Sequence, residues 1–125
     1  MERTYVPGVC NLSDAEARRR NVAGWSGLIV TVVLEAYFIY ANVAPAVRLV
    51  VFIPAAISAM GFLQGLMHFC VNFGMRGVFN MSSDVGKTDT VAQAEYRAQD
   101  KRKARQIIIH SVLIGIIVAA LAFLL

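Results

Sequence analysis

The sequence predicts an all-α membrane protein with three transmembrane helices. Hydrophobic residues make up 58% of its 125 residues and charged residues 16%, against about 25% charged residues in an ordinary soluble domain. Three stretches of about 20 residues or more carry almost no charge, and each is long enough for a helix to cross a hydrocarbon core of about 30 Å. The chain is too short to add a large soluble domain to these spans. One small membrane unit is therefore expected.

The N-terminal tail, residues 1–21, is expected to stay on the protein. It is mostly polar, and the apolar stretch after it is longer than the apolar region of about 7 to 15 residues in a signal peptide. Ser13 and Glu16 have the spacing of a capping box. A helix is therefore expected to begin near Asp14 and to continue into the bilayer.

The first span is expected over residues 22–43 and contains one charged residue, Glu35. The turn after it, residues 42–47, contains Pro45, which suits a tight turn or the first position of a helix. The first two spans are therefore expected to form a hairpin.

The second span is expected over residues 48–73. Arg48 and Arg76 bracket a run that contains no Asp, Glu, Lys or Arg. Pro54 can kink this helix, because it leaves one backbone carbonyl without its usual donor.

A loop over residues 74–89 and a polar helix over residues 91–105 are expected next. The loop is rich in Gly, Ser and Asn, and Thr90 and Gln93 repeat the capping-box spacing after it. The polar helix is expected to continue without interruption into the third span, residues 106–125.

Basic residues predict the orientation of the three spans. The tail holds four arginines, and residues 74–105 hold seven lysines and arginines. The short connection between the first two spans has only Arg48, directly after residues 42–47. By the positive-inside rule, the tail and residues 74–105 lie in the cytoplasm and the C-terminus lies outside. Four of these residues cluster just before the third span and are expected to contact anionic lipid headgroups: Lys101, Arg102, Lys103 and Arg105. Nucleic-acid binding is not expected, because no folded reader accompanies the cluster.

Small residues predict where the helices touch. In lipid, helices associate through close backbone approach and through polar side chains that find partners. The second span carries such a stripe at alternating steps of four and three: Pro54, Ser58, Gly61, Gly65, His68 and Asn72. The first span carries a similar stripe of Gly24, Gly27, Thr31, Glu35, Phe38 and Asn42, and the third carries Ser111, Gly115 and Ala119. Gly61 and Gly65 form a GxxxG pair, and Ser111 and Gly115 are expected to pack in the same way.

Glu35 is the most costly residue to place in the membrane. A carboxylate of this kind costs about 2.5 to 3.5 kcal/mol at a helix centre, and Glu35 lies about 20 Å along the helix from Val22, nearer the outer side. The compensation can come from Arg48 reaching back, a partner subunit, a water-filled cavity or protonation. A functional role would be proton or cation handling, although neither histidine lies within about 10 Å in depth.

Four residues near the expected cytoplasmic face are candidate ligands for zinc, copper or haem: Cys10, His68, Cys70 and His110. Their spacing does not favour a site, since His68 and Cys70 are about 200° apart around a helix and no CxxC or HxxxH occurs. No cofactor is the expectation, with both cysteines as free thiols in a reducing compartment.

Gly86-Lys87-Thr88 matches the end of a phosphate-binding loop. Met81 stands where the first glycine of that motif is required, and no strand is expected before it. Nucleotide binding is therefore not expected, and no hydrolase signature is present.

Two pieces of the chain resemble a group of small uncharacterised bacterial membrane proteins. They are Cys10-Asn11-Leu12 before Arg18-Arg19-Arg20, and His68-Phe69-Cys70 leading to Phe73-Gly74 and Gly77-Val78-Phe79-Asn80. The resemblance transfers no activity. It implies a bacterial cytoplasmic (inner) membrane and a cytoplasmic surface made by residues 9–12 and 68–80.

The function expected from these features is a non-catalytic accessory or structural subunit of a larger membrane complex, such as a respiratory or photosynthetic one. Its partners would be membrane lipids and larger integral membrane subunits. One alternative is a small redox, metal or haem protein using the four candidate ligands. Another is a small proton-coupled transporter or channel-like oligomer centred on Glu35, which resembles small multidrug transporters only in having a glutamate in its first span.

Overall fold

The computed structural model describes residues 4–82 and 87–125. Three helices are long and apolar enough to cross a membrane: Asp14–Tyr40, Pro45–Met67 and Ala94–Leu124. The protein is thus mostly helical, as expected. Two features of the sequence lie outside the described residues, namely Arg3 of the tail and Gly86 of the loop comparison.

Helix α1 (Asp14–Tyr40) begins where the capping residues predict. The Ser13 side chain accepts a hydrogen bond from the Glu16 N–H at 3.4 Å. The reciprocal half of the capping box does not form, because the Ser13 N–H donates to the Asn80 carbonyl at 2.7 Å. The Glu16 side chain therefore makes contacts elsewhere.

The second apolar helix is built in three joined pieces. Helix α2 (Pro45–Arg48) has Pro45 in its first turn, η1 (Leu49–Val51) is a 3₁₀ turn, and α3 (Phe52–Met67) follows directly. The 3₁₀ turn contains Val50, four residues before Pro54. Proline cannot donate to that carbonyl, so a tighter turn at this point fits the sequence.

The second span ends earlier than expected. The sequence predicts one helix over residues 48–73, but α3 stops at Met67, where His68 takes the left-handed conformation with φ 51°. A separate short helix, α4 (Val71–Arg76), follows. The Gln64 side chain accepts from the Val71 N–H at 2.9 Å, which stabilises the reversal. Because the helix ends here, His68 and Asn72 do not continue the stripe of small residues.

A small two-stranded sheet replaces part of the expected loop. Strand β1 (Val78–Phe79) pairs antiparallel with β2 (Asp89–Thr90), with Val78 opposite Thr90 and Phe79 opposite Asp89. Gly77 ends α4 with φ 71°, a conformation that glycine adopts freely.

Helix α5 (Ala94–Leu124) joins the polar helix and the third span without a break, as expected, although it starts later. The spacing predicts Thr90 as its capping residue, but Thr90 belongs to β2, and no side chain caps the helix at Gln93. The Val91 N–H donates to the Gly77 carbonyl at 2.8 Å, so pairing with distant residues holds this segment extended.

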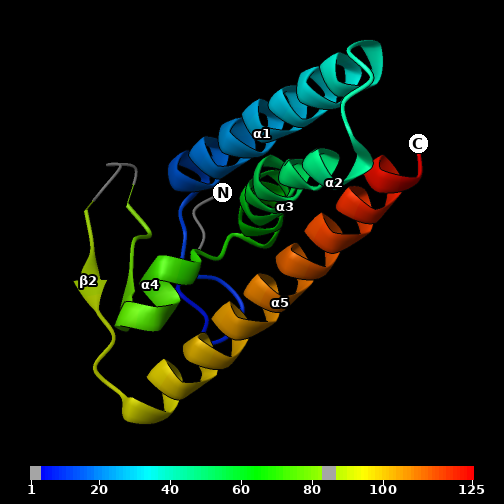
Figure 1. The fold of residues 1–125 in the computed structure, drawn as a ribbon. Helices are drawn as coiled ribbons and strands as arrows, with labels where there is room; N and C mark the ends of the chain where they lie inside the picture. The colour runs from blue at the N-terminus through cyan, green and yellow to red at the C-terminus, as the bar shows by residue number, and fades with distance from the viewer. Residues whose placement is uncertain (1–3, 83–86) are drawn as a thin grey trace.

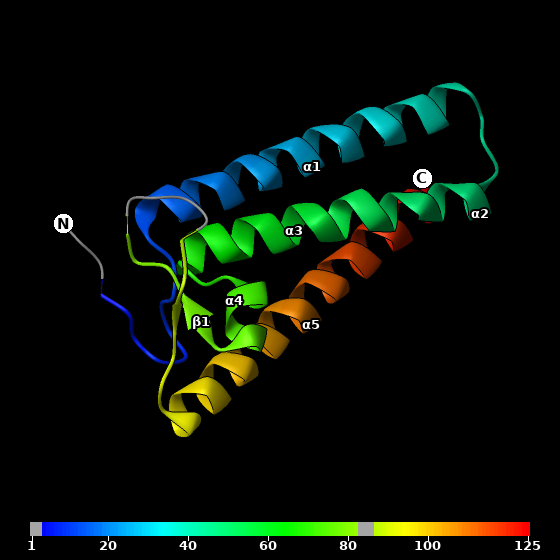
Figure 2. The same ribbon diagram turned by 90° about the vertical axis from the view of Figure 1, so that its left-hand side faces the viewer.

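Helix α3 lies between α1 and α5 (Figures 1 and 2). α4, the two strands and the N-terminal tail gather at the end where α1 and α5 begin (Figure 1). We call this part the head: residues 4–13, 68–82 and 87–93. At the opposite end, Phe38 of α1, Val51 of η1 and Ala119 and Ala122 of α5 form one buried apolar cluster.

Candidate functional site

Helices α1 and α3 touch through their backbones. A Cβ atom on Gly61 would lie 2.6 Å from the Gly24 nitrogen, and one on Gly27 would lie 2.9 Å from the Ser58 Cα. The Ser58 hydroxyl donates to the Gly24 carbonyl at 2.7 Å. A Cβ on Gly65 would overlap the Asn21 side chain. The glycine stripes of these two helices therefore face one another.

The contact between α3 and α5 is made by side chains. A Cβ on Gly115 would lie 3.0 Å from the Ala56 Cβ and from the Phe52 ring. The buried Ser111 hydroxyl contacts the Met60 sulfur at 3.8 Å. Here the helices are held by fitted side chains rather than by backbone contact.

The Glu35 carboxylate is buried without a partner. Both of its oxygens are shielded from solvent, and neither has a hydrogen-bond partner among the described residues. Arg48, the candidate within this chain, does not meet it: its Nε donates to the Val43 carbonyl at 3.1 Å. Arg48, one of the four candidate sources of compensation, therefore does not pair with Glu35 in this structure, and its guanidinium bonds the turn after α1 instead.

Glu35 lines a groove between α1 and α5. A cavity of about 370 Å³ has Thr31 and Glu35 on one wall and Val118 and Leu121 on the other, with Val51 between them. A second cavity of about 430 Å³ shares lining residues with the first and is floored by α3. We call the two together the α1–α5 groove.

The hydroxyl groups of the α1–α5 groove already donate to backbone carbonyls. Thr31 donates to the Gly27 carbonyl at 2.7 Å, and Ser58 donates to the Gly24 carbonyl. The other lining side chains, Glu35 apart, are apolar. The α1–α5 groove is thus apolar apart from these two satisfied hydroxyl groups and the Glu35 carboxylate, which has no hydrogen-bond partner among the described residues.

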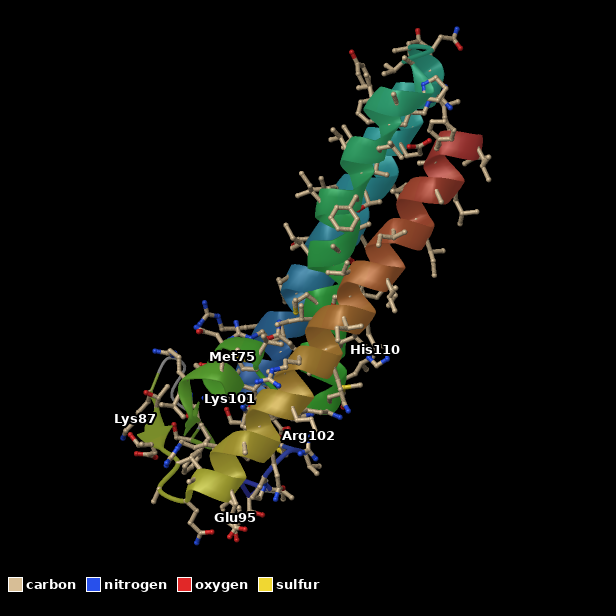
Figure 3. All side chains as sticks on the ribbon, turned by 60° about the horizontal axis from the view of Figure 1, so that its bottom comes forward. Met75, Lys87, Glu95, Lys101, Arg102 and His110 are labelled. Carbon is tan, nitrogen blue, oxygen red and sulfur yellow. The ribbon has the colours of Figure 1, made fainter. Side chains whose placement is uncertain are left out.

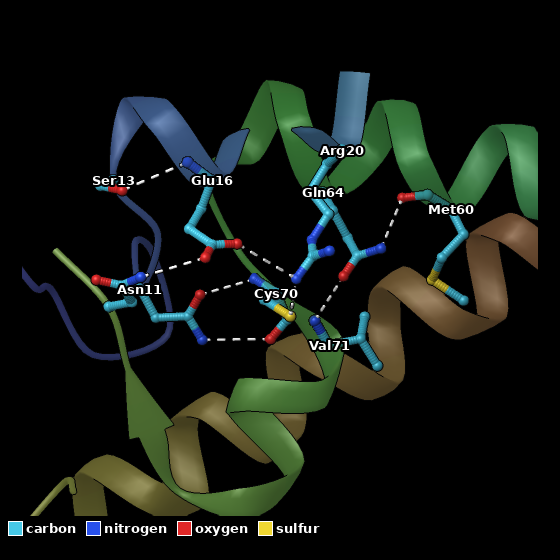
Figure 4. A network of polar contacts seen from close by, with 9 residues as sticks. Asn11, Ser13, Glu16, Arg20, Met60, Gln64, Cys70 and Val71 are labelled. Carbon is cyan, nitrogen blue, oxygen red and sulfur yellow. Dashed lines mark hydrogen bonds and ion pairs between the residues drawn. The ribbon is translucent and has the colours of Figure 1, made fainter. Parts of the chain in front are cut away.

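A second candidate site is a buried polar network in the head (Figure 4). Asn11 is fully buried; its Oδ1 accepts from the Cys70 N–H at 2.7 Å and its Nδ2 donates to the Cys70 carbonyl at 3.3 Å. The Asn11 N–H donates to the His68 carbonyl at 3.0 Å. One asparagine therefore supplies hydrogen-bond partners to the backbone N–H and carbonyl groups where the chain reverses after α3.

The same network contains a buried charge pair and a thiol. Glu16, 1% exposed, accepts from Asn80 Nδ2 at 3.2 Å, and one of its oxygens lies 3.7 Å from a guanidinium nitrogen of Arg20. The Arg20 guanidinium also donates to the Cys70 sulfur at 3.2 Å. These contacts join the start of α1 to the segments on either side of α4 and stabilise the head as one unit.

The four candidate metal ligands are not brought together. The Cys70 sulfur faces Arg20, the Cys10 sulfur lies 3.7 Å from the Leu12 carbonyl, and His68 Nε2 lies 2.8 Å from an Asp14 oxygen. His110 is exposed on α5. In the part of the chain that the structure describes, no three His, Cys, Asp or Glu residues form a group suited to a metal ion. Both cysteines are free thiols.

Charged side chains gather around the first turns of α5 (Figure 3). Lys101, Arg102 and Arg105 are exposed there, and Lys103 is half-buried. Asp100 lies beside this cluster yet is fully buried, and its two oxygens accept from the Tyr5 hydroxyl and from the Gly8 N–H.

Sequence reasoning missed Asp100, although a signal was present. Asp100 continues the small-residue stripe of α5 toward its start, in the order Asp100, Ala104, Ile107, Ser111, Gly115 and Ala119, all buried. The sequence indicates Asn11 and Asn80 only through the resemblance, and it does not indicate Gln64. No spacing rule marks these three, because their partners are distant in the chain.

Comparison with models of protein families, with curated proteins and with solved structures finds no match.

Proposed function

We propose that this protein is a non-catalytic accessory or structural subunit of a larger membrane complex, such as a respiratory or photosynthetic one. A transmembrane helix of that complex lies in the α1–α5 groove and donates a hydrogen bond or a positive charge to Glu35. The membrane is a bacterial cytoplasmic membrane, with the head on the cytoplasmic side.

The observation that carries the proposal is the Glu35 carboxylate, buried and unpartnered among the described residues. An intramembrane carboxylate without a partner is costly, and such residues almost always face a bundle interior or a partner. In this fold the bundle interior is open between α1 and α5. A neighbouring helix fills the groove, and a hydrogen-bond donor on that helix removes the cost of the unpartnered carboxylate.

The shape of the bundle also supports a helical occupant. Helices α1 and α5 both pack on α3 and leave an apolar channel between them, and small or hydroxyl residues such as Thr31 and Ser58 line it. Small residues allow close approach of another helix in lipid. The occupant is therefore expected to be a transmembrane helix with a Lys, Arg, Ser, Thr, Asn or Gln at the level of Glu35.

A second candidate function rests on the same residue. In a proton-coupled transporter or channel-like oligomer, Glu35 would bind and release a proton or a cation within the membrane. Apart from Glu35, Thr31 and Ser58, the lining side chains that the structure describes are apolar. None besides Glu35 is a titratable side chain, which favours the accessory role.

The test is co-purification of the full chain in mild detergent, at native expression, with mass spectrometry of the proteins that migrate with it. Glu35→Leu removes the acceptor and is expected to weaken retention of the larger partner about tenfold. Glu35→Gln keeps hydrogen bonding and is expected to retain more partner than Glu35→Leu. Val33→Gln is the matched control, because Val33 is 63% exposed and faces away from the groove.

A lone monomer in the wild-type preparation would contradict the accessory role, as would full retention of the partner by Glu35→Leu. Loss of proton-coupled uptake in Glu35→Gln, with assembly unchanged, would instead support the transporter role.

A further inference from the structure

A polar hollow of about 340 Å³ lies where the head meets α5, between the N-terminal turn at residues 7–9 and residues 99–106 of α5. Four side chains of α5 line it: Gln99, Arg102, Lys103 and Gln106. The described lining thus contains two positive charges and two amides, and it contains no carboxylate. The positive charges suit an anionic group, and the amides suit uncharged oxygen atoms on the same ligand.

The wall opposite α5 is fixed in place. Gly8, at φ 69°, allows the turn, and its N–H donates to one oxygen of Asp100 at 2.8 Å. The Tyr5 hydroxyl donates to the other oxygen of Asp100. Because Asp100 is fully buried and both its oxygens are used by the tail, the hollow is preformed.

The two positive charges are available to a ligand. Among the described residues, neither the Arg102 side chain nor the Lys103 side chain forms an ion pair or a hydrogen bond. A guanidinium binds phosphate oxygens in a fork, and an ammonium adds a compact point charge. The amides of Gln99 and Gln106 can donate to ester or hydroxyl oxygens beside the phosphate.

The hollow lies at the depth of lipid headgroups. No charged residue occurs between Arg105 and the C-terminus, and the lipid-facing surface begins with Ile109, which is 57% exposed. Gln106 precedes Ile109 by about 4.5 Å along the helix. Val9, 58% exposed, stands at the rim of the hollow, where it can contact the upper part of an acyl chain.

We propose that this hollow is a binding site for the phosphodiester headgroup of an anionic glycerophospholipid. Arg102 and Lys103 bind the phosphate oxygens, and Gln99 and Gln106 bind oxygens of the glycerol or of its substituent. The site is distinct from a general attraction of basic residues to an anionic surface, because only two of the four clustered cations line it. It does not depend on the α1–α5 groove.

The chain offers a matched pair of variants for the test. Arg102→Gln with Lys103→Gln removes the two charges of the hollow, whereas Lys101→Gln with Arg105→Gln removes two charges from the same turns of α5 outside it. Both pairs change the net charge by the same amount. Diffuse attraction predicts that the two double variants lose lipid binding equally. A site predicts that the variant of the hollow loses more.

The measurement is native mass spectrometry of the full chain in detergent, titrated with phosphatidylglycerol. We expect the hollow variant to bind it at least about tenfold more weakly, and the outer variant to stay within about threefold of the wild type. Inorganic phosphate in excess is expected not to displace the lipid. Circular dichroism and thermal unfolding identify any variant that fails to fold, and Arg102→Lys with Lys103→Arg is expected to retain binding.

Equal losses in the two double variants would overturn the proposal in favour of diffuse surface attraction. Displacement by inorganic phosphate would also overturn it, since the hollow would then be a small-anion site rather than a lipid site.

Discussion

At the scale of residues, two buried carboxylates of this chain have opposite environments. Asp100 accepts from the Tyr5 hydroxyl and the Gly8 N–H, and it holds the tail against α5. Glu35 has no partner among the described residues. The first is a structural contact completed within the chain, whereas the second leaves both carboxylate oxygens without a donor among the described residues. This difference is why we place the interaction with a partner at Glu35.

Tyr5 makes the stability of the head depend on pH. Burial, and then the hydrogen bond to Asp100 and its negative charge, raise the pKa of Tyr5 above its usual value of about 10. The protonated tyrosine therefore stabilises the fold below pH of about 10. This stabilisation is lost as pH rises from there toward the raised pKa, because only the unfolded chain has released its proton.

Tyr5→Phe is expected to remove this pH-dependent component. It should also lower the free energy of unfolding at neutral pH by about 1 to 2 kcal/mol, since one oxygen of Asp100 loses its donor. Thermal unfolding in detergent at neutral and at high pH checks both expectations. The other tyrosines are present in both proteins and serve as the internal control. An equal loss of stability at high pH in the wild type and in Tyr5→Phe would contradict the role of Tyr5.

At the scale of elements, the two helix contacts of α3 differ in kind. The contact with α1 is made by glycines and backbone, since a Cβ atom added to Gly61 would come within 2.6 Å of the Gly24 nitrogen. The contact with α5 is made by side chains around Gly115, where an added Cβ would lie 3.0 Å from the Ala56 Cβ and from the Phe52 ring. A rigid backbone cannot move aside locally, whereas a side chain can adjust its rotamer.

Gly61→Ala is therefore expected to lower the free energy of unfolding by about 1 to 3 kcal/mol, because α1 must move away from α3. Gly115→Ala, the matched control, is expected to cost less than about 1 kcal/mol. Unfolding in mixed micelles of mild detergent and dodecyl sulfate measures both. A larger loss in Gly115→Ala than in Gly61→Ala would contradict the assignment of the tight contact to α1 and α3.

At the scale of the whole molecule, α3 packs on both α1 and α5, and the groove that Glu35 lines lies between α1 and α5. The head closes the bundle at one end through Asn11, Glu16 and Asp100, all buried. One end of the protein is thus closed by contacts within the chain, while the α1–α5 groove is open along one side of the bundle.

The proposed orientation can be tested with two single cysteines. Asn42→Cys lies in the turn between the first two spans, and Glu95→Cys lies at the start of α5; both positions are exposed. We expect a membrane-impermeant maleimide to label Asn42→Cys in intact cells and Glu95→Cys only after permeabilisation. The natural cysteines are buried and give a low background. Labelling of Glu95→Cys in intact cells would contradict the proposed orientation.

The three spans, the start of α1 at Ser13 and the unbroken run of α5 follow from the sequence alone, because hydropathy and capping depend on neighbours along the chain. The glycine stripes also follow from helical spacing. The end of α3 at His68 and the extended backbone at Thr90 do not, since distant acceptors and donors at Asn11 and Gly77 determine them. Periodicity contains no information on such pairings.

Composition and spacing are therefore enough to identify a membrane protein with three apolar helices and one costly carboxylate. They do not reveal that Arg48 bonds the Val43 carbonyl, that Asp100 holds the tail, or that a groove lies between α1 and α5. These features are seen only in the folded chain. Burial in lipid depends on local composition, whereas the partner of a polar group depends on which distant segments the fold brings within hydrogen-bond reach.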